Sequence, residues 1–198
     1  MCTVVSLLIM DSNLSNPKPN NWKIAVILYL CSFVGDMFDG MAARHFDQSS
    51  TFGAVLDMLT DRITTAAMLV VLTWIYPSER LFYFCVLALD ITSHWLQMYS
   101  SLLCKLHHKS KESNEGRFFL VRWFYGNFWF FGYLCVGAEM FYVARFCEFY
   151  SGSLFFEGLK KFCLPAMTLK NIVNVAQMGS AAHMIAEKDV KEYNGKRS

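Results

Sequence analysis

Four aspartates stand at positions where charged side chains are rare. Asp36 and Asp39 lie three residues apart near the end of one apolar run, and Asp57 and Asp61 lie four apart near the start of the next. Residues three or four apart share one face of a helix, and a tight turn between the runs would bring the two faces together. Ionisable groups inside apolar runs are costly and indicate function. The spacing therefore predicts one cluster of four carboxylates.

This cluster predicts a site for a hard divalent cation. Four carboxylates cannot all stay ionised at close range without a counter-charge, and oxygen ligands suit Mg²⁺ or Mn²⁺ better than Zn²⁺. Between the acids lie Gly40 and Ala43, which are small, and Arg44, whose forked guanidinium suits phosphate oxygens. A single aspartate at a helix end is equally well explained as a cap or an interfacial residue. Together, carboxylates, metal and arginine indicate phosphoryl transfer.

The apolar runs that carry these residues are long enough to cross a membrane. Of the 198 residues, 55% are hydrophobic and only 17% charged, whereas soluble domains have about 25% charged residues. A spanning helix needs ~20 apolar residues. Five runs reach or approach that length, and a sixth at 3–10 is too short. The five are residues 22–41, 53–76, 81–103, 118–145 and 155–185.

Composition also excludes several classes of protein. A soluble domain, a disordered chain and a collagen-like repeat do not fit, and a net charge of +2 is too small to indicate nucleic-acid binding. The seven cysteines are scattered, which argues against a disulfide framework or a zinc site. Lys and Arg are more frequent on the side of the turn at 44–50 and of the C-terminal tail. That bias predicts a cytosolic location for both.

The spacing of the acids resembles a family signature. Residues 36–61 read D-x2-D-G-x2-A-R-x8-G-x3-D-x3-D, which is similar to the motif of the CDP-alcohol phosphotransferase family with every fixed position filled. The resemblance implies an all-α integral membrane protein, a polytopic helix bundle with five full spans plus a shortened first one. It also implies an active site open to the cytosol, where an alcohol attacks a CDP-linked lipid and releases CMP.

Position in the motif implies a role for each of its residues. Asp36, Asp39 and Asp57 would bind metal, and Asp61 would join a second metal or act as general base. The CDP portion of the lipid would be held by a group of three residues, and Gly53 would permit close helix contact. That group is Gly40, Ala43 and Arg44.

Other stretches bear on the acceptor alcohol. Residues 89–101, 137–142 and 165–170 are similar to eukaryotic phosphatidylinositol synthases, which implies CDP-diacylglycerol and myo-inositol as substrates. One helix face at 81–103 carries a polar stripe that either lines the acceptor site or bonds to other helices. Lys170 either pairs with Glu139 or orients substrate. The stripe consists of Asp90, Ser93, His94 and Gln97.

Three alternatives stay open at this point. Within the same chemistry, the chain could be a phosphatidylglycerophosphate synthase, although 81–103 offers no extra cation for an anionic acceptor. The acids could form the transit site of a divalent-cation transporter, which leaves the arginine unexplained. The short first run would suit an inactive truncated partner.

The resemblance further implies an endoplasmic reticulum membrane protein that forms a homodimer. We expect an atypical N-terminal segment at 1–21, the transferase domain at 22–186 and a basic cytosolic tail at 187–198.

Overall fold

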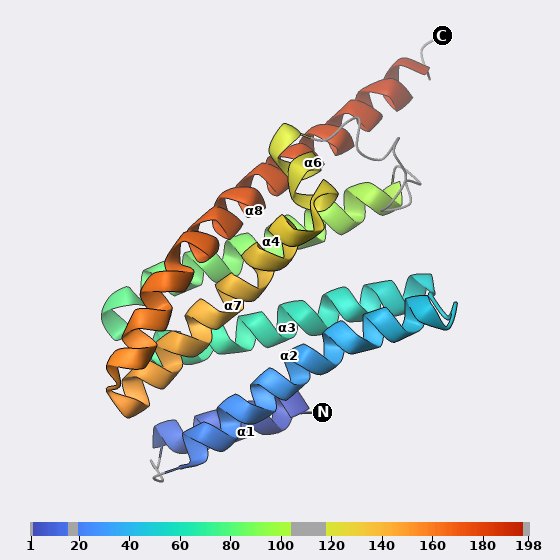
Figure 1. Ribbon diagram of the computed structural model, residues 1–198. Coiled ribbons are helices and arrows are strands. Elements are labelled where there is room, and N and C mark those ends of the chain that lie inside the picture. The colour runs from blue at the N-terminus through green and yellow to red at the C-terminus, as the bar shows by residue number, and fades with distance from the viewer. Residues whose placement is uncertain (1, 16–19, 104–117, 196–198) are drawn as a thin grey trace. The chain divides into compact units, whose positions relative to one another are not determined.

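The computed structural model describes residues 2–15, 20–103 and 118–195, and all regular structure in these ranges is helical (Figure 1). The all-α prediction is therefore confirmed for this part of the chain. In order, the helices are α1 (Cys2–Ser15), α2 (Asn21–His45), α3 (Thr51–Ile75), the 3-10 turn η1 (Pro77–Glu79), α4 (Arg80–Leu103), α6 (Phe119–Gly126), α7 (Phe128–Ser151) and α8 (Leu154–Gly195).

The helices follow the expected runs closely, with one break that the sequence analysis missed. The runs at 22–41, 53–76 and 81–103 coincide with α2, α3 and α4. The run at 118–145 is divided at Asn127, whose side-chain Oδ1 accepts a hydrogen bond from the backbone N–H of Phe130 at 3.0 Å. An asparagine in this role starts a new helix. The segment between the runs at 81–103 and 118–145 lies outside the described residues, as does part of the segment before the run at 22–41.

Three helical segments in the described ranges are long and apolar enough to cross a membrane. They are Asn21–Ala43, Pro77–Leu103 and Phe128–Ser151. Helix α1 has 14 residues, which corresponds to about 21 Å against a hydrocarbon thickness of about 30 Å. The chain is thus helical with three candidate spans, and the expected total of five full spans stays a prediction.

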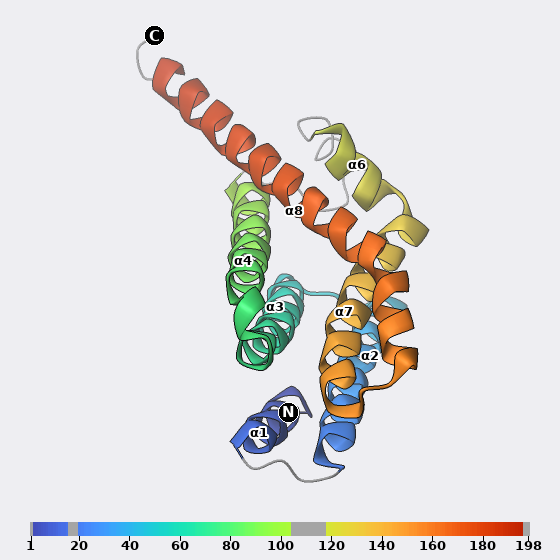
Figure 2. The same ribbon diagram turned by 90° about the vertical axis from the view of Figure 1, so that its left-hand side faces the viewer.

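The chain divides into two compact units. Unit 1 comprises Met1–Phe84 and Met140–Lys161, and unit 2 comprises Cys85–Glu139 and Phe162–Ser198. Three helices, α4, α7 and α8, contribute residues to both units. Figure 2 follows α8 as one long helix to the C-terminal end, with Pro165 inside it.

In unit 1, α1 packs beside α2 (Figure 1). The hydroxyl of Ser6 donates a hydrogen bond to the carbonyl of Ala25 at 2.8 Å. Met10, Ala25 and Tyr29 are fully buried. A buried hydroxyl needs a hydrogen-bond partner. This bond therefore fixes the register of α1 against α2.

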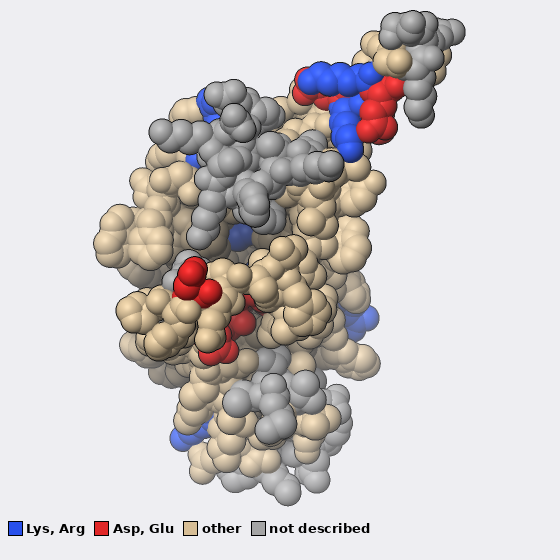
Figure 3. Space-filling view, turned by 90° about the vertical axis from the view of Figure 1, so that its right-hand side faces the viewer, with Lys and Arg blue, Asp and Glu red and all other residues tan. Residues whose placement is uncertain are grey.

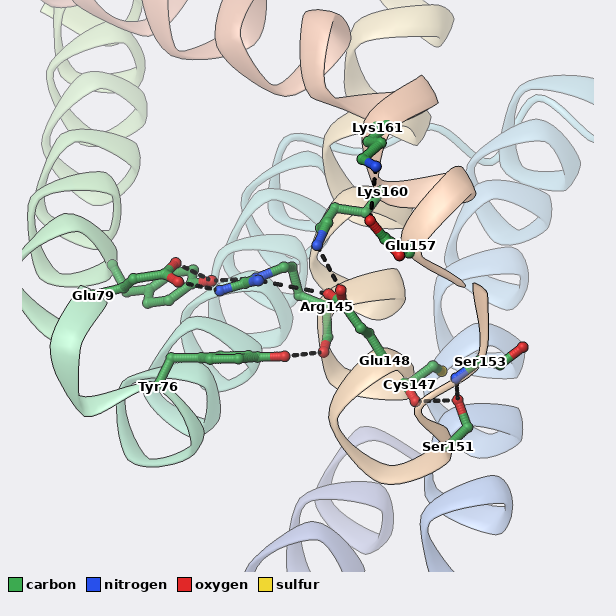
Figure 4. A network of polar contacts seen from close by, with 11 residues as sticks. Tyr76, Glu79, Arg145, Cys147, Glu148, Ser151, Ser153, Glu157, Lys160 and Lys161 are labelled. Carbon is green, nitrogen blue, oxygen red and sulfur yellow. Dashed lines mark hydrogen bonds and ion pairs between the residues drawn. The ribbon is translucent and has the colours of Figure 1, made fainter. Parts of the chain in front are cut away.

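A polar network around Arg145 joins four elements of unit 1 (Figure 4). The Arg145 guanidinium lies over the ring of Tyr76, 3.8 Å from its centroid, and forms an ion pair with Glu79. Its Nε donates a hydrogen bond to the hydroxyl of Tyr83 at 3.0 Å. In return, the Tyr76 hydroxyl donates to the Arg145 carbonyl oxygen at 2.9 Å. The loop after α3, η1, α4 and α7 therefore meet at one guanidinium.

The network continues onto α8 through a second acid. Glu148 lies 3.5 Å from the Arg145 guanidinium and accepts a hydrogen bond from Lys160 at 2.6 Å (Figure 4). Only 11% of the Arg145 side chain is exposed. Removing one member of a largely buried charge network leaves its partners uncompensated.

We predict that Arg145→Met lowers the free energy of unfolding by about 2–4 kcal/mol, because Glu79 loses its counter-charge, Glu148 keeps only Lys160, and the hydrogen bond to Tyr83 is lost. Thermal melting of the detergent-solubilised protein measures this loss. The control is Lys161→Met, which removes a mostly exposed pair with Glu157 and should change stability by less than about 0.5 kcal/mol. Equal melting temperatures for the two variants would contradict the prediction.

In unit 2, α7 and α8 are in very close contact at one glycine. A Cβ built on Gly137 would lie far inside van der Waals distance of the Ala166 Cβ. Ala166 is fully buried, and it belongs to a core with Phe124, Leu134 and Val173. The approach of the two helices therefore depends on the missing side chain at residue 137.

We predict opposite effects for two glycine substitutions in the same helix. Gly137→Ala should destabilise the protein by about 1–3 kcal/mol through overpacking. Gly132→Ala, where a Cβ would meet nothing within 4 Å, should stabilise it by about 0.5–1 kcal/mol through helix propensity. Melting temperatures of the two variants check the pair. A stabilising Gly137→Ala would show that the close contact is not real.

Candidate functional site

A short turn joins the two helices that carry the four aspartates. Helix α2 ends at His45, and Asp47 then adopts a positive φ of 53°, a conformation that aspartate tolerates better than most residues. Helix α3 begins after Ser50, whose side chain accepts a hydrogen bond from the Gly53 N–H at 2.9 Å. This N-cap fixes where α3 starts and therefore where its acids lie.

Gly53 serves this cap rather than contact with another helix. A Cβ at this position would lie 3.0 Å from the Ser50 hydroxyl oxygen, and outside its own helix backbone it would meet nothing else within 4 Å among the described residues. The expectation that Gly53 permits close helix contact was wrong. Its constraint is local, because a side chain here would press on the hydroxyl that caps α3.

The four aspartates come together in unit 1. The carboxyl groups of Asp36 and Asp61 are within hydrogen-bonding range, and Asp57 and Asp39 are near enough to Asp36 to interact with it electrostatically. Asp36 and Asp61 are half-buried, whereas Asp39 and Asp57 are exposed. Figure 3 shows acidic side chains exposed on this face of the molecule. The guanidinium of Arg62 lies 3.5 Å from Asp61.

The donors fit a hard divalent cation in kind. All are carboxylate oxygens from one helix pair, which is the chemistry that Mg²⁺ and Mn²⁺ prefer. Two neighbouring carboxylates stay ionised only with a cation between them. Among the described residues, no three acidic, histidine or cysteine side chains already stand together as a metal ligand set. The four aspartates are therefore neighbours, and their side chains would have to rotate toward one another to bind one ion.

The residues expected to hold the CDP portion lie on the last turns of α2. Gly40 and Ala43 are half-buried. Arg44 follows Gly40 by four residues, which places the two on the same face of α2. Gly40 directly follows Asp39, so the positions predicted to bind phosphate come immediately after those predicted to bind metal.

The predicted polar stripe on α4 is buried in unit 2. Asp90, Ser93 and Gln97 are all less than a tenth exposed, and His94 is half-buried. The Ser93 hydroxyl donates to the Asp90 carbonyl oxygen at 3.1 Å, and His94 Nδ1 lies 2.8 Å from the same oxygen. The four residues thus share a face that points into the protein, as their spacing predicted.

A second buried polar stripe, which the sequence analysis missed, lies on α8. Its members recur at helical spacing within the run at 155–185, and this periodicity could have revealed them. Lys170 donates to the Asn174 side-chain oxygen at 2.6 Å, and Asn174 Nδ2 donates to Asp90 Oδ1 at 3.4 Å. Asn174 therefore links Lys170 to the α4 stripe. The α8 stripe consists of Lys170, Asn174, Gln177 and Ser180.

Helices apolar enough to cross a membrane, together with a helix pair that carries four aspartates, indicate a class of helical membrane protein. The family model for CDP-alcohol phosphatidyltransferases matches residues 1–146, and the chain belongs to this family. No solved structure matches the chain.

Three relatives of this chain bear the name of the same enzyme activity. A CDP-diacylglycerol–inositol 3-phosphatidyltransferase of Arabidopsis thaliana is 38% identical over 87% of this chain and 82% of its own length. The enzyme of that name from Saccharomyces cerevisiae is 37% identical over 85% and 77%. The human enzyme is 36% identical over 83% and 79%.

We predict that Asp36→Asn raises the free energy of unfolding of the metal-free protein by about 1 kcal/mol, because it removes one of several mutually repelling carboxylates. Melting in EDTA-containing buffer measures the change. Asp189→Asn, at an exposed position of α8, is the control and should change nothing. A loss of stability in the Asp36 variant would show that the carboxylates do not repel one another.

Proposed function

We propose that this chain transfers the phosphatidyl group of CDP-diacylglycerol to myo-inositol and releases CMP. The observation that carries the proposal is the gathering of the motif aspartates at the α2–α3 turn, in a chain that matches inositol phosphatidyltransferases over most of its length. An inositol hydroxyl oxygen bonds to the phosphorus that carries diacylglycerol. The bond from that phosphorus to the bridging oxygen breaks, and CMP leaves with the bridging oxygen.

In this proposal the four aspartates have different roles. Asp36, Asp39 and Asp57 hold Mg²⁺ or Mn²⁺, which supplies charge neutralisation to the phosphates. Asp61 either joins them as a ligand or accepts the proton of the attacking hydroxyl. Its side chain is 41% exposed, so an incoming hydroxyl can reach it. The guanidinium of Arg62 lies 3.5 Å from the Asp61 carboxylate.

The CDP portion is held by Gly40, Ala43 and Arg44. The absence of a side chain on the first lets a phosphate approach the helix backbone, and the guanidinium of the last provides a forked donor for phosphate oxygens. These contacts position the lipid phosphorus for attack, which is where most of the rate enhancement in phosphoryl transfer arises.

The acceptor is bound by Asp90, Ser93, His94 and Lys170. A neutral polyol needs donors and acceptors more than net charge. The chain of hydrogen bonds from Lys170 through Asn174 to Asp90 joins a cation to an anion and supports that preference. An anionic acceptor, as in phosphatidylglycerophosphate synthesis, would favour unpaired cations instead.

The proposal also covers the setting of the enzyme. We place it in the endoplasmic reticulum membrane as a homodimer with five full spans and a shortened first one, and with its active site facing the cytosol. The transferase domain is 22–186, preceded by 1–21 and followed by a cytosolic tail at 187–198.

The C-terminal end of α8 supports a location in water. Acidic and basic side chains alternate there (Figure 3). Glu187 accepts a hydrogen bond from Lys191, which lowers the pKa of that glutamate. Exposed pairs of this kind occur on hydrated helix surfaces.

We predict inositol-dependent CMP release from purified protein in liposomes that contain CDP-diacylglycerol and Mn²⁺. Asp61→Asn should lower kcat by about 10²-fold or more, because it removes a base or a metal ligand. EDTA should abolish release. Asp189→Asn should leave the rate unchanged.

Other outcomes would select an alternative. Release with glycerol 3-phosphate but not with myo-inositol would identify a phosphatidylglycerophosphate synthase. Cation flux without CMP release would indicate a transporter. If neither acceptor supports release and no flux occurs, the chain is not an enzyme by itself, as expected of an inactive partner.

A further inference from the structure

Two buried glutamines of unit 2 have hydrogen-bonding atoms that the protein does not use. Gln97 is 5% exposed, and neither its side-chain oxygen nor its side-chain nitrogen has a hydrogen-bond partner in the described part of the chain. Gln177 is fully buried. Its Nε2 donates to the Tyr125 hydroxyl at 2.8 Å, whereas its Oε1 has no partner there. Buried amides are nearly always hydrogen-bonded, so these three atoms require an explanation.

The two glutamines face the same interface. Asn174 bonds to Asp90, and Lys188 bonds to the carbonyl of Leu103, at sequence separations of 84 and 85 residues. A nearly constant separation means that α4 and α8 run side by side in the same direction within unit 2. Gln177 therefore lies opposite residue 93, and Gln97 lies one turn further along. The four residues from 93 to 97 correspond to an axial distance of about 6 Å.

The other polar groups of the two stripes, and the neighbouring buried hydroxyl of Ser100, already have partners. The Ser100 hydroxyl donates to the Gln97 carbonyl oxygen at 2.9 Å, and the Ser93 hydroxyl donates to the carbonyl of Asp90. Lys170 and Asn174 are joined as described above. Within the two stripes, unused hydrogen-bonding capacity is thus concentrated at the two glutamines; outside them on α8, Asn171 Oδ1 also has no partner in the described part of the chain. This concentration distinguishes a ligand site from general bonding between helices, which would satisfy all positions alike.

The chemistry of these atoms suits hydroxyl groups. A carboxamide both donates and accepts hydrogen bonds, as a hydroxyl does, and it has no charge. The ends of the nearby hydrogen-bond chain, Lys170 and Asp90, have opposite charges. We propose that the amides of Gln97 and Gln177 bind hydroxyls of the acceptor alcohol and select a neutral polyol over an anionic one. This inference rests on the proposed function and makes the two glutamines its specificity-determining residues.

Gln97→Met tests the proposal in the full-length protein, because methionine keeps the shape of the side chain and removes the amide. The KM for myo-inositol should rise about tenfold, the equivalent of one or two hydrogen bonds. The kcat and the KM for CDP-diacylglycerol should stay within about twofold. Ser100→Ala is the matched control, since that buried hydroxyl bonds to its own helix, and it should leave all three constants unchanged.

Melting temperature supplies a second readout that does not depend on turnover. Without ligand, Gln97→Met should melt at the same temperature as the parent protein or higher, because it removes an unpaired buried amide. Added myo-inositol should raise the melting temperature of the parent protein and of Ser100→Ala, but not that of Gln97→Met. Glycerol 3-phosphate should raise none of them. Gln177→Met should repeat the loss of inositol protection.

The outcomes separate this inference from the proposed function. An active parent protein whose KM for inositol is unchanged by Gln97→Met would overturn the inference and leave the function standing. If the parent protein releases no CMP, the function fails and melting decides the inference. Inositol protection that is lost in Gln97→Met would then support a polyol site. Protection that persists in the variant, or that is absent from the parent protein, would overturn it.

Discussion

Mutual repulsion of carboxylates is the constraint on which the rest of the structure depends. Asp36 is within reach of three other acids, and two of the four are half-buried. Such a group persists only if the helices around it are held by other contacts and if a cation or protons offset the charge. The cap at Ser50, the contact between α1 and α2 and the network around Arg145 all belong to the same unit. Each stabilises a helix arrangement that the acids alone would oppose.

In the second unit, the charges that lie close together are opposite in sign rather than alike. There the polar stripes of α4 and α8 are largely buried, and the opposite charges of Lys170 and Asp90 are joined through Asn174. The close approach at Gly137 holds α7 against α8 in that unit, which keeps α8 in a fixed position. A fixed, nearly neutral polar interface suits recognition by hydrogen bonds, whereas a cluster of like charges suits ions and phosphates.

Patterns that depend on one helix were predictable from the sequence, whereas contacts between helices were not. The runs that became α2, α3 and α4, the clustering of the four aspartates and the buried face of Asp90 and Ser93 follow from hydrophobicity and helical period. The break at Asn127 was missed because a single cap interrupts an aromatic-rich run without a proline. Gly53 was misread because its constraint is the cap hydroxyl of Ser50. The bond from Asn174 to Asp90 depends on the register of α4 against α8, which no local pattern encodes.

The boundaries between the two units fall inside helices, at residues 84, 139 and 161. Neither unit is therefore a continuous piece of chain, and cutting at any boundary would sever a helix. Chain synthesis proceeds from the N-terminus, so the helix pair with the four aspartates emerges early. The segment Met140–Lys161, which completes its unit, emerges only after more than fifty residues of the other unit have been made. During that interval the acidic hairpin must exist without Arg145, Glu148 and Lys160, and a bound cation would protect it most when it is least supported.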